Sequence, residues 1–127
     1  MKEVSFDFDG TLEFQSIQNY AKELMEKGFE VHVTTSRWED VTKYPFKVEN
    51  HNDLFKVTDE IGIKRENIHF TNMEYKHKFL KNTDFIVHID DNTDEVKFIT
   101  MFTDVFPVDL FSHNWKYLCN TKLGINK

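Results

Sequence analysis

The stretch covering residues 4–11, Val-Ser-Phe-Asp-Phe-Asp-Gly-Thr, constrains the fold more than any other part of the chain. Its apolar residues alternate with smaller or polar ones, which is the pattern of a strand. Asp7 and Asp9 lie two positions apart, so on a strand their carboxylates would point to the same side. Like charges about 4 Å apart repel by roughly 4 kcal/mol at an effective dielectric constant near 20. A metal ion or a role in proton transfer would account for this pairing, and Gly10 then lets the chain turn.

The next residues predict a helix and a second strand. Apolar residues recur at helical spacing over 17–25, Ser16 is a candidate N-cap, and Gly28 is placed to end the helix. Residues 29–34 alternate again and form the next predicted strand. A strand, a helix and a strand joined by short turns make a right-handed crossover unit, so we expect the two strands to be parallel.

The remaining patterns continue this alternation. The apolar run over 85–89 is typical of an interior strand that is buried on both faces. Pro45 would interrupt any helical turn before it, and Pro107 is tolerated in a strand at the edge of a sheet. We expect further strands over 67–70, 85–89 and 104–108, and further helices over 53–61 (capped by Asn52 or Asp53), 73–80 (capped by Asn72) and 94–102 (with Val96, Ile99 and Phe102 facing inward).

Strands that alternate with helices predict an α/β fold: a three-layer, Rossmann-like parallel sheet of about five strands with helices on both faces. The 127 residues suit a single domain over 1–127. The net charge of −6 argues against broad electrostatic binding of nucleic acid. The sequence contains no apolar run near the roughly 20 residues of a membrane span, so we expect no membrane contact. The single cysteine, Cys119, suits a reducing, cytoplasmic setting.

Polar residues gather directly after three of the predicted strands. The carboxyl ends of parallel strands lie at one edge of the sheet, where ligands bind near the switch in strand order. We therefore expect one site built from three groups of residues. These groups are Asp7 with Asp9, Thr35 with Ser36 and Arg37, and Asp90 with Asp91.

The acidic residues of these groups favour magnesium. Asp7, Asp9, Asp90 and Asp91 offer only oxygen ligands, without a histidine or cysteine at matching spacing. Hard oxygen ligands select Mg²⁺, which is typically shared with a substrate phosphate, and they disfavour zinc. Four histidines show no metal-binding spacing and are expected to be structural: His32, His69, His77 and His88.

Together these residues resemble the four motifs of the haloacid dehalogenase (HAD) superfamily. The resemblance rests on Asp7-Phe8-Asp9-Gly10-Thr11, on Thr35 after a hydrophobic strand, on a lysine, and on Asp90-Asp91 after another hydrophobic strand. The order and spacing of the motifs agree with the family over most of the chain. The resemblance implies a HAD-like fold and a small Mg²⁺-dependent phosphatase, a phosphoric monoester hydrolase.

The resemblance also implies roles for individual residues. Asp7 would be the nucleophile that forms an aspartyl-phosphate. Asp9 would be the general acid for the leaving group and then the base that activates water. Thr35 would hydrogen-bond the phosphoryl oxygens, with Thr34 as the alternative. An acid at the position of Asp9 fits a hydrolase or phosphotransferase, whereas transport ATPases of the family lack it.

A lysine should neutralise the phosphate and the nucleophile, because phosphoryl transfer depends mostly on positioning and charge. Lys76 is assigned this role since an apolar residue follows it four positions later, as in the family, and Lys78 is the alternative. Asp90 would complete the Mg²⁺ site with Asp7 and the backbone carbonyl of Asp9.

Several neighbours of these motifs have more than one expected role. Asp91 is a metal ligand, a second acceptor or a helix-capping acid, and Asp94 is a helix-terminal charge or a partner of the metal site. Arg37 binds substrate or forms a surface ion pair. The candidate substrate-binding residues are Gly10, Thr11, Ser36 and Arg37.

Members of the family usually carry a cap domain that selects the substrate. Here one helix and one strand fill the segment from Asp9 to Thr35, and two short helices and a strand fill that from Thr35 to Lys76, so neither has room for a cap. An open site can accept the end of a macromolecule or a phosphoprotein as substrate. It could also be covered by a segment of another subunit, so the pattern is compatible with an oligomer. The sequence leaves the class of phosphorylated substrate open.

Other functions are compatible with parts of the pattern. A nucleotide-directed phosphatase or phosphotransferase would use the same groups, but a kinase would need a glycine-rich phosphate loop that the chain lacks. A non-catalytic phosphate-binding or interaction module would not need both Asp7 and Asp9. A receiver domain of two-component signalling has its acidic pair early and its lysine late, the reverse of the order here.

Overall fold

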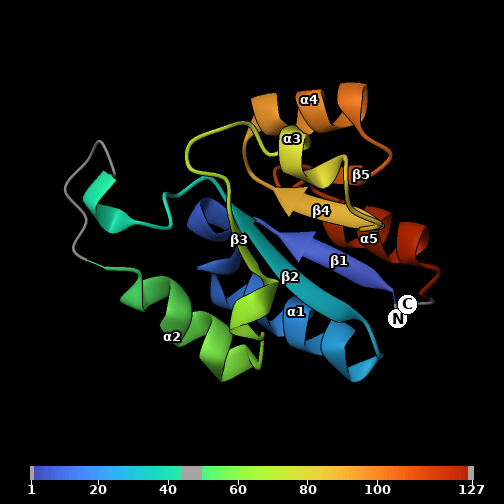
Figure 1. Cartoon of the computed structure of the whole chain (residues 1–127). Helices are drawn as coiled ribbons and strands as arrows, with labels where there is room; N and C mark the ends of the chain where they lie inside the picture. Colours follow the sequence, from blue (N-terminus) through green and yellow to red (C-terminus); the bar gives the residue numbers. More distant parts are fainter. Residues whose placement is uncertain (1, 44–49, 126–127) are drawn as a thin grey trace.

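The computed structural model describes residues 2–43 and 50–125, and the expected effect of Pro45 lies outside these residues. Within them, five parallel strands form one sheet in the order β3-β2-β1-β4-β5 (Figure 1). This confirms the predicted parallel α/β sheet, with β5 and Pro107 at an edge. The strands are β1 (Glu3–Phe6), β2 (Glu30–Thr35), β3 (Ile68–Phe70), β4 (Val87–Asp90) and β5 (Phe106–Asp109).

Helices cover both faces of this sheet (Figure 1). One face packs against α1 (Gln15–Glu26), α2 (Asn52–Ile61) and α5 (Trp115–Leu123), and the other packs against α3 (His77–Leu80) and α4 (Thr93–Phe102). Short helical turns complete the described elements: η1 (Phe8–Leu12), η2 (Val41–Lys43) and η3 (Arg65–Asn67). None of the described helices has the length and apolar character needed to cross a bilayer.

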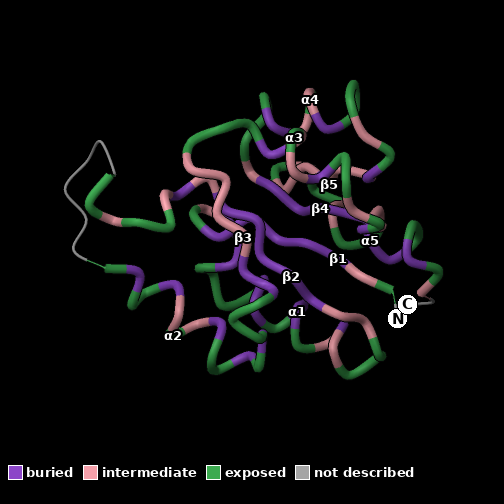
Figure 2. The backbone as a smooth tube through the Cα atoms, in the orientation of Figure 1, coloured by how far each residue is buried: buried purple, intermediate pink, exposed green. Residues whose placement is uncertain are grey.

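The two faces of the sheet differ in chemistry because side chains alternate along each strand. Val4, Phe6 and Val33 point into the large apolar core beneath α1, α2 and α5. Ser5, His32 and other polar residues face α3 and α4, yet they too are buried, as the buried central strands in Figure 2 show. A buried polar face requires internal hydrogen-bond partners, and these partners lie around the candidate site.

Several predicted element ends are wrong. The N-cap of α1 is Phe14 without a side-chain hydrogen bond, so Ser16 lies inside the helix. Asn72 does not cap a helix over 73–80, because Asn72 and Met73 form a turn at φ 55° and 68° and only His77–Leu80 is helical. Phe102 is 53% exposed rather than inward-facing.

Glycines follow α1 and α2, and Gly28 does so as predicted. Gly28 follows α1 at φ 92°, and Gly62 ends α2 at φ 98°, in the left-handed region that favours glycine. The predicted caps of α2 are wrong, since Asn52 and Asp53 already belong to the helix and His51 precedes it.

Candidate active site

Asp7 and Asp9 lie just beyond β1, and their side chains diverge. The strand ends at Phe6, and Asp7 continues it with an extended backbone whose N–H donates to the Ile89 carbonyl of β4 at 2.8 Å. The chain then turns through η1, where the Leu12 N–H donates to the Asp7 carbonyl at 3.1 Å. Asp7 is buried and Asp9 is exposed, so the expectation that both carboxylates project to one side of a strand is wrong.

Lys76 joins Asp7 to Asp90. Its Nζ atom donates to Asp7 Oδ1 at 2.7 Å and to Asp90 Oδ2 at 2.6 Å, and all three side chains are buried. The Lys76 backbone N–H donates to Glu95 Oε1 at 3.0 Å, so α4 helps to hold the lysine. Lys78, the alternative, is exposed and pairs with Glu74 at 3.3 Å. The tertiary structure therefore selects Lys76 as the lysine of this site.

The Lys76 ammonium group contacts two buried carboxylates, those of Asp7 and Asp90. The pKa values of these two carboxylates shift in opposite directions. Burial raises the pKa of Asp7 well above its ordinary value, Asp90 adds to this effect, and Lys76 only partly opposes it. Burial acts in the same direction on Asp90, but the His88 hydrogen bond and Lys76 outweigh it and hold the pKa of Asp90 below its usual range. Burial lowers the pKa of Lys76, whereas Asp7 and Asp90 raise it above its ordinary value, so the lysine stays charged.

A chain of buried hydrogen bonds runs behind Asp90. His88 Nε2 lies 2.7 Å from Asp90 Oδ2, and His88 Nδ1 lies 2.8 Å from Ser5 Oγ. Burial lowers the pKa of His88, so the neutral ring donates from Nε2 to the carboxylate and accepts at Nδ1 from Ser5. Ser5 Oγ in turn accepts from Thr34 Oγ1 at 2.8 Å.

These buried hydrogen bonds change the interpretation of Thr34 and His88. Thr34, the alternative phosphate ligand, has its hydroxyl committed to Ser5 on the face beneath α3 and α4. Thr35 points the other way, and its hydroxyl accepts the Arg37 N–H at 3.3 Å. His88 orients Asp90, a role that sequence reasoning missed although the two residues alternate onto the same side of β4.

Asp9 has its own cation. Arg37 donates from Nε and Nη2 to the two Asp9 carboxylate oxygens at 3.0 and 2.7 Å, and from Nη1 and Nη2 to those of Asp53 at 3.0 and 2.8 Å. Burial lowers the pKa of Arg37, but the hydrogen bonds to Asp53 and Asp9 outweigh it and raise that pKa above its ordinary value. Of the two roles expected for Arg37, the structure shows ion pairs, in which the Arg37 side chain is buried and the carboxylates of Asp9 and Asp53 are exposed.

Thr11 and Gly10 complete the surroundings of Asp7 and Asp91. The Thr11 hydroxyl donates to Asp7 Oδ2 at 3.1 Å, so this predicted substrate-binding residue contacts the Asp7 carboxylate. Gly10 lies against the Asp91 carboxylate with φ 77°, so a side chain there would meet Asp91 directly. Ser36 lies at the sheet edge, where its carbonyl accepts the Met73 N–H at 2.6 Å.

We expect Gly10→Ala to destabilise the protein more than Gly28→Ala does. Both positions have positive φ and carry a strain of about 1 kcal/mol for alanine. Only at Gly10 would the added methyl also displace a side chain, that of Asp91, whereas nothing lies within 4 Å at Gly28. Thermal unfolding of the two variants measures the difference. Equal melting temperatures would contradict the close approach of Gly10 to Asp91.

The donor set at this edge of the sheet fits magnesium. Oxygens of Asp7, Asp90 and Asp91 all lie within 4.8 Å of one another, and all three are hard carboxylate ligands. Of the other predicted contributors, Asp94 lies in the exposed first turn of α4 outside this group, and a role for the Asp9 carbonyl stays a prediction. Three carboxylates against one lysine leave the site short of positive charge, as a site for a divalent cation requires.

Comparisons of the chain with protein-family models, with curated proteins and with solved structures find no match.

Proposed function

We propose that this protein is a Mg²⁺-dependent phosphohydrolase of the HAD type that acts on phosphomonoesters through an aspartyl-phosphate on Asp7. The observation that carries the proposal is the arrangement of Asp7. Its carboxylate contacts Lys76 and Thr11 beside Asp90 and Asp91, at the carboxyl edge of a parallel sheet. Phosphoryl transfer needs such a nucleophile surrounded by positive charge and hydrogen-bond donors.

The chemistry divides between two carboxylates. An Asp7 oxygen attacks phosphorus, forming the acyl phosphate bond, while the bond between phosphorus and the leaving oxygen breaks. Asp9 supplies a proton to that oxygen, and it later takes a proton from the water that attacks phosphorus and releases Asp7. Lys76 neutralises the reacting anions, and Thr35 and Ser36 are proposed to hold phosphoryl oxygens. Asp7, Asp90 and Asp91 would hold Mg²⁺, which would supply further positive charge for the phosphoryl group.

Arg37 is proposed to hold Asp9 at the mouth of the site. The Asp9 side chain is 54% exposed although Arg37 binds both of its oxygens, so it meets solvent while Asp7 is buried nearby. A leaving group that approaches Asp9 can therefore extend away from the protein. We propose that the substrate is the phosphorylated end or side chain of a larger molecule.

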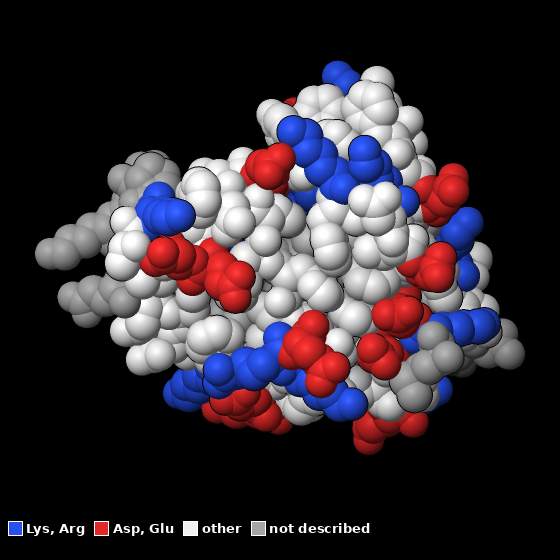
Figure 3. Space-filling view, viewed as in Figure 1, with Lys and Arg blue, Asp and Glu red and all other residues white. Residues whose placement is uncertain are grey.

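The surface around the sheet mixes charges of both signs. On the face shown in Figure 3, groups of lysines and arginines and groups of acidic residues lie around a middle region made mostly of other residues. Such a surface offers local rather than broad attraction for an anion, since exposed charges are screened beyond roughly 10 Å at ordinary salt. Selection of the substrate is proposed to depend on groups close to Asp9.

The leaving-group dependence of Asp9→Asn tests this proposal. With Mg²⁺ present, the variant should hydrolyse an alkyl phosphate about 10²–10⁴ times more slowly than the parent protein, since an alkoxide needs the proton. With 4-nitrophenyl phosphate, whose leaving group is stable as an anion, nitrophenol should be released in a burst as the phosphoenzyme accumulates. Rates with EDTA in place of Mg²⁺ provide the control, and both substrates should then be inert. Equal losses for both substrates without a burst would contradict the assignment of Asp9.

A further inference from the structure

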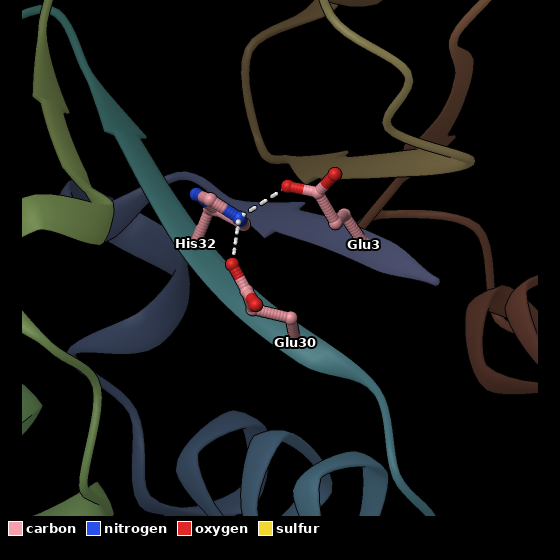
Figure 4. A group of neighbouring side chains, drawn as sticks. All are labelled: Glu3, Glu30 and His32. Carbon is pink, nitrogen blue, oxygen red and sulfur yellow. Dashed lines mark ion pairs between the residues drawn. The ribbon is translucent and has the colours of Figure 1, made fainter. Parts of the chain in front are cut away.

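A second group of ligand atoms lies at the amino end of the sheet, away from the candidate active site. Glu3 begins β1 and Glu30 begins β2, and these two residues are direct neighbours in the parallel register. His32 follows Glu30 by two positions, so its ring projects on the same side of the strand. Figure 4 shows the imidazole directed at both carboxylates.

The Nε2 atom of His32 has no hydrogen-bond partner among the described residues. It lies 2.8 Å from Glu3 Oε2 and 3.2 Å from Glu30 Oε1, as the dashed lines in Figure 4 mark. Neither contact has hydrogen-bond geometry, and Nε2 is unpartnered among the described residues although the side chain is only 7% exposed. A buried polar nitrogen aimed between two carboxylates indicates a ligand that binds all three groups.

The other ring nitrogen of His32 is engaged. His32 Nδ1 lies 3.0 Å from His69 Nε2, and the two rings are stacked with their centroids 5.2 Å apart. Phe85 packs on His32 with a centroid distance of 4.4 Å and restricts the ring further. A metal-binding histidine typically donates its second N–H to a neighbour in this way, which orients the ring and frees the first nitrogen for the metal.

The charges at this position also call for a cation. Glu3 and Glu30 face each other on adjacent strands, and like charges directly opposite in a sheet destabilise it. Within residues 2–43 and 50–125, neither glutamate forms an ion pair with a lysine or arginine. Their side chains are 32% and 38% exposed, so an ion can reach them from solvent.

We propose that Glu3, Glu30 and His32 bind a divalent transition-metal ion, with Zn²⁺ as the favoured ion. Such an ion would link the amino-terminal ends of β1 and β2. The three ligand atoms lie within 4.8 Å of one another. One imidazole and two carboxylates suit Zn²⁺, and the remaining coordination position goes to water. This site differs from the all-oxygen group at Asp7, Asp90 and Asp91, and it does not depend on the proposed phosphatase activity.

Calorimetric titration of the whole chain with Zn²⁺ in millimolar Mg²⁺ tests the site. We expect binding at one equivalent that is weakened at least about 10-fold in Glu3→Gln/Glu30→Gln. Glu60→Gln/Glu66→Gln removes the same charge from exposed positions elsewhere and should bind Zn²⁺ as the parent does. Melting temperatures complete the comparison: Zn²⁺ should raise that of the parent and of the control, but not that of the site variant.

Histidine ¹⁵N NMR supplies a readout that a merely structural histidine would not give. Zn²⁺ should shift His32 Nε2 and leave a protonated Nδ1. His69→Asn, which alters no ligand, should lower the Zn²⁺ affinity about 10-fold. The proposal is overturned if Glu3→Gln/Glu30→Gln binds Zn²⁺ as the parent does. It is equally overturned if His32 is an imidazolium paired with both glutamates and unaffected by Zn²⁺.

Discussion

Asp7→Asn should abolish the hydrolysis of 4-nitrophenyl phosphate in the presence of Mg²⁺, with kcat at least about a thousandfold lower, because removal of a nucleophile leaves only positioning and charge. The amide has the size of the carboxylate and can still accept a hydrogen bond from Thr11 or Lys76. It cannot form the acyl phosphate. Acid quenching followed by mass spectrometry should find phosphate on the peptide that contains Asp7 in the parent protein and none in the variant.

The same substitution should leave the fold intact. Burial raises the pKa of Asp7, so at neutral pH the folded state carries a cost for the ionised form that the unfolded chain does not. A neutral asparagine removes this cost, and the melting temperature of Asp7→Asn should equal or exceed that of the parent. Loss of activity without loss of stability separates a catalytic role from a structural one.

Asp94→Asn is the matched control for Asp7→Asn. Asp94 lies in the exposed first turn of α4, close in sequence to Asp90 and Asp91 but outside the group of clustered oxygens. Its variant should hydrolyse the aryl phosphate at nearly the parent rate. An Asp7→Asn protein that retains the parent rate would exclude the aspartyl-phosphate mechanism.

Lys76→Met should have the largest effect on stability, lowering the free energy of unfolding by about 3–5 kcal/mol. The apolar side chain fills much of the same volume, but it leaves Asp7 and Asp90 buried without the ammonium group that both now contact. Urea denaturation measures the loss. Lys78→Met removes a lysine of α3 whose side chain is 57% exposed, and it should change stability by no more than about 0.5 kcal/mol.

A double variant shows where the loss in Lys76→Met arises. Asp7→Asn in the Lys76→Met background removes one of the two stranded carboxylates, so it should recover part of the lost stability. Equal stabilities for Lys76→Met and Lys78→Met would mean that the buried contacts of Lys76 are not formed in solution. Recovery by Asp7→Asn would identify charge, rather than packing, as the cause.

Patterns of short range predicted much of the fold. Strand alternation over 29–34 and helical spacing over 17–25 depend on residues close in sequence, and β2 and α1 formed there within one or two residues of the prediction. Errors fell where local signals compete with packing. Residues 73–80 have helical spacing, yet the chain turns at Asn72 and Met73 and carries Lys76 into the buried site.

The sequence by itself determined which strands carry acidic residues at their carboxyl ends, because strand periodicity and turn signals depend only on residues close together in the sequence. It also pointed to Lys76, through a motif spacing. Only the tertiary structure decided how charges are shared: Lys76 lies 69 residues from Asp7, and Arg37 lies 28 residues from Asp9. Asp53, the second partner of Arg37, has no local signature, because an ion pair depends on distance in space and not along the chain. His88 differs, since strand alternation places it on the same side of β4 as Asp90.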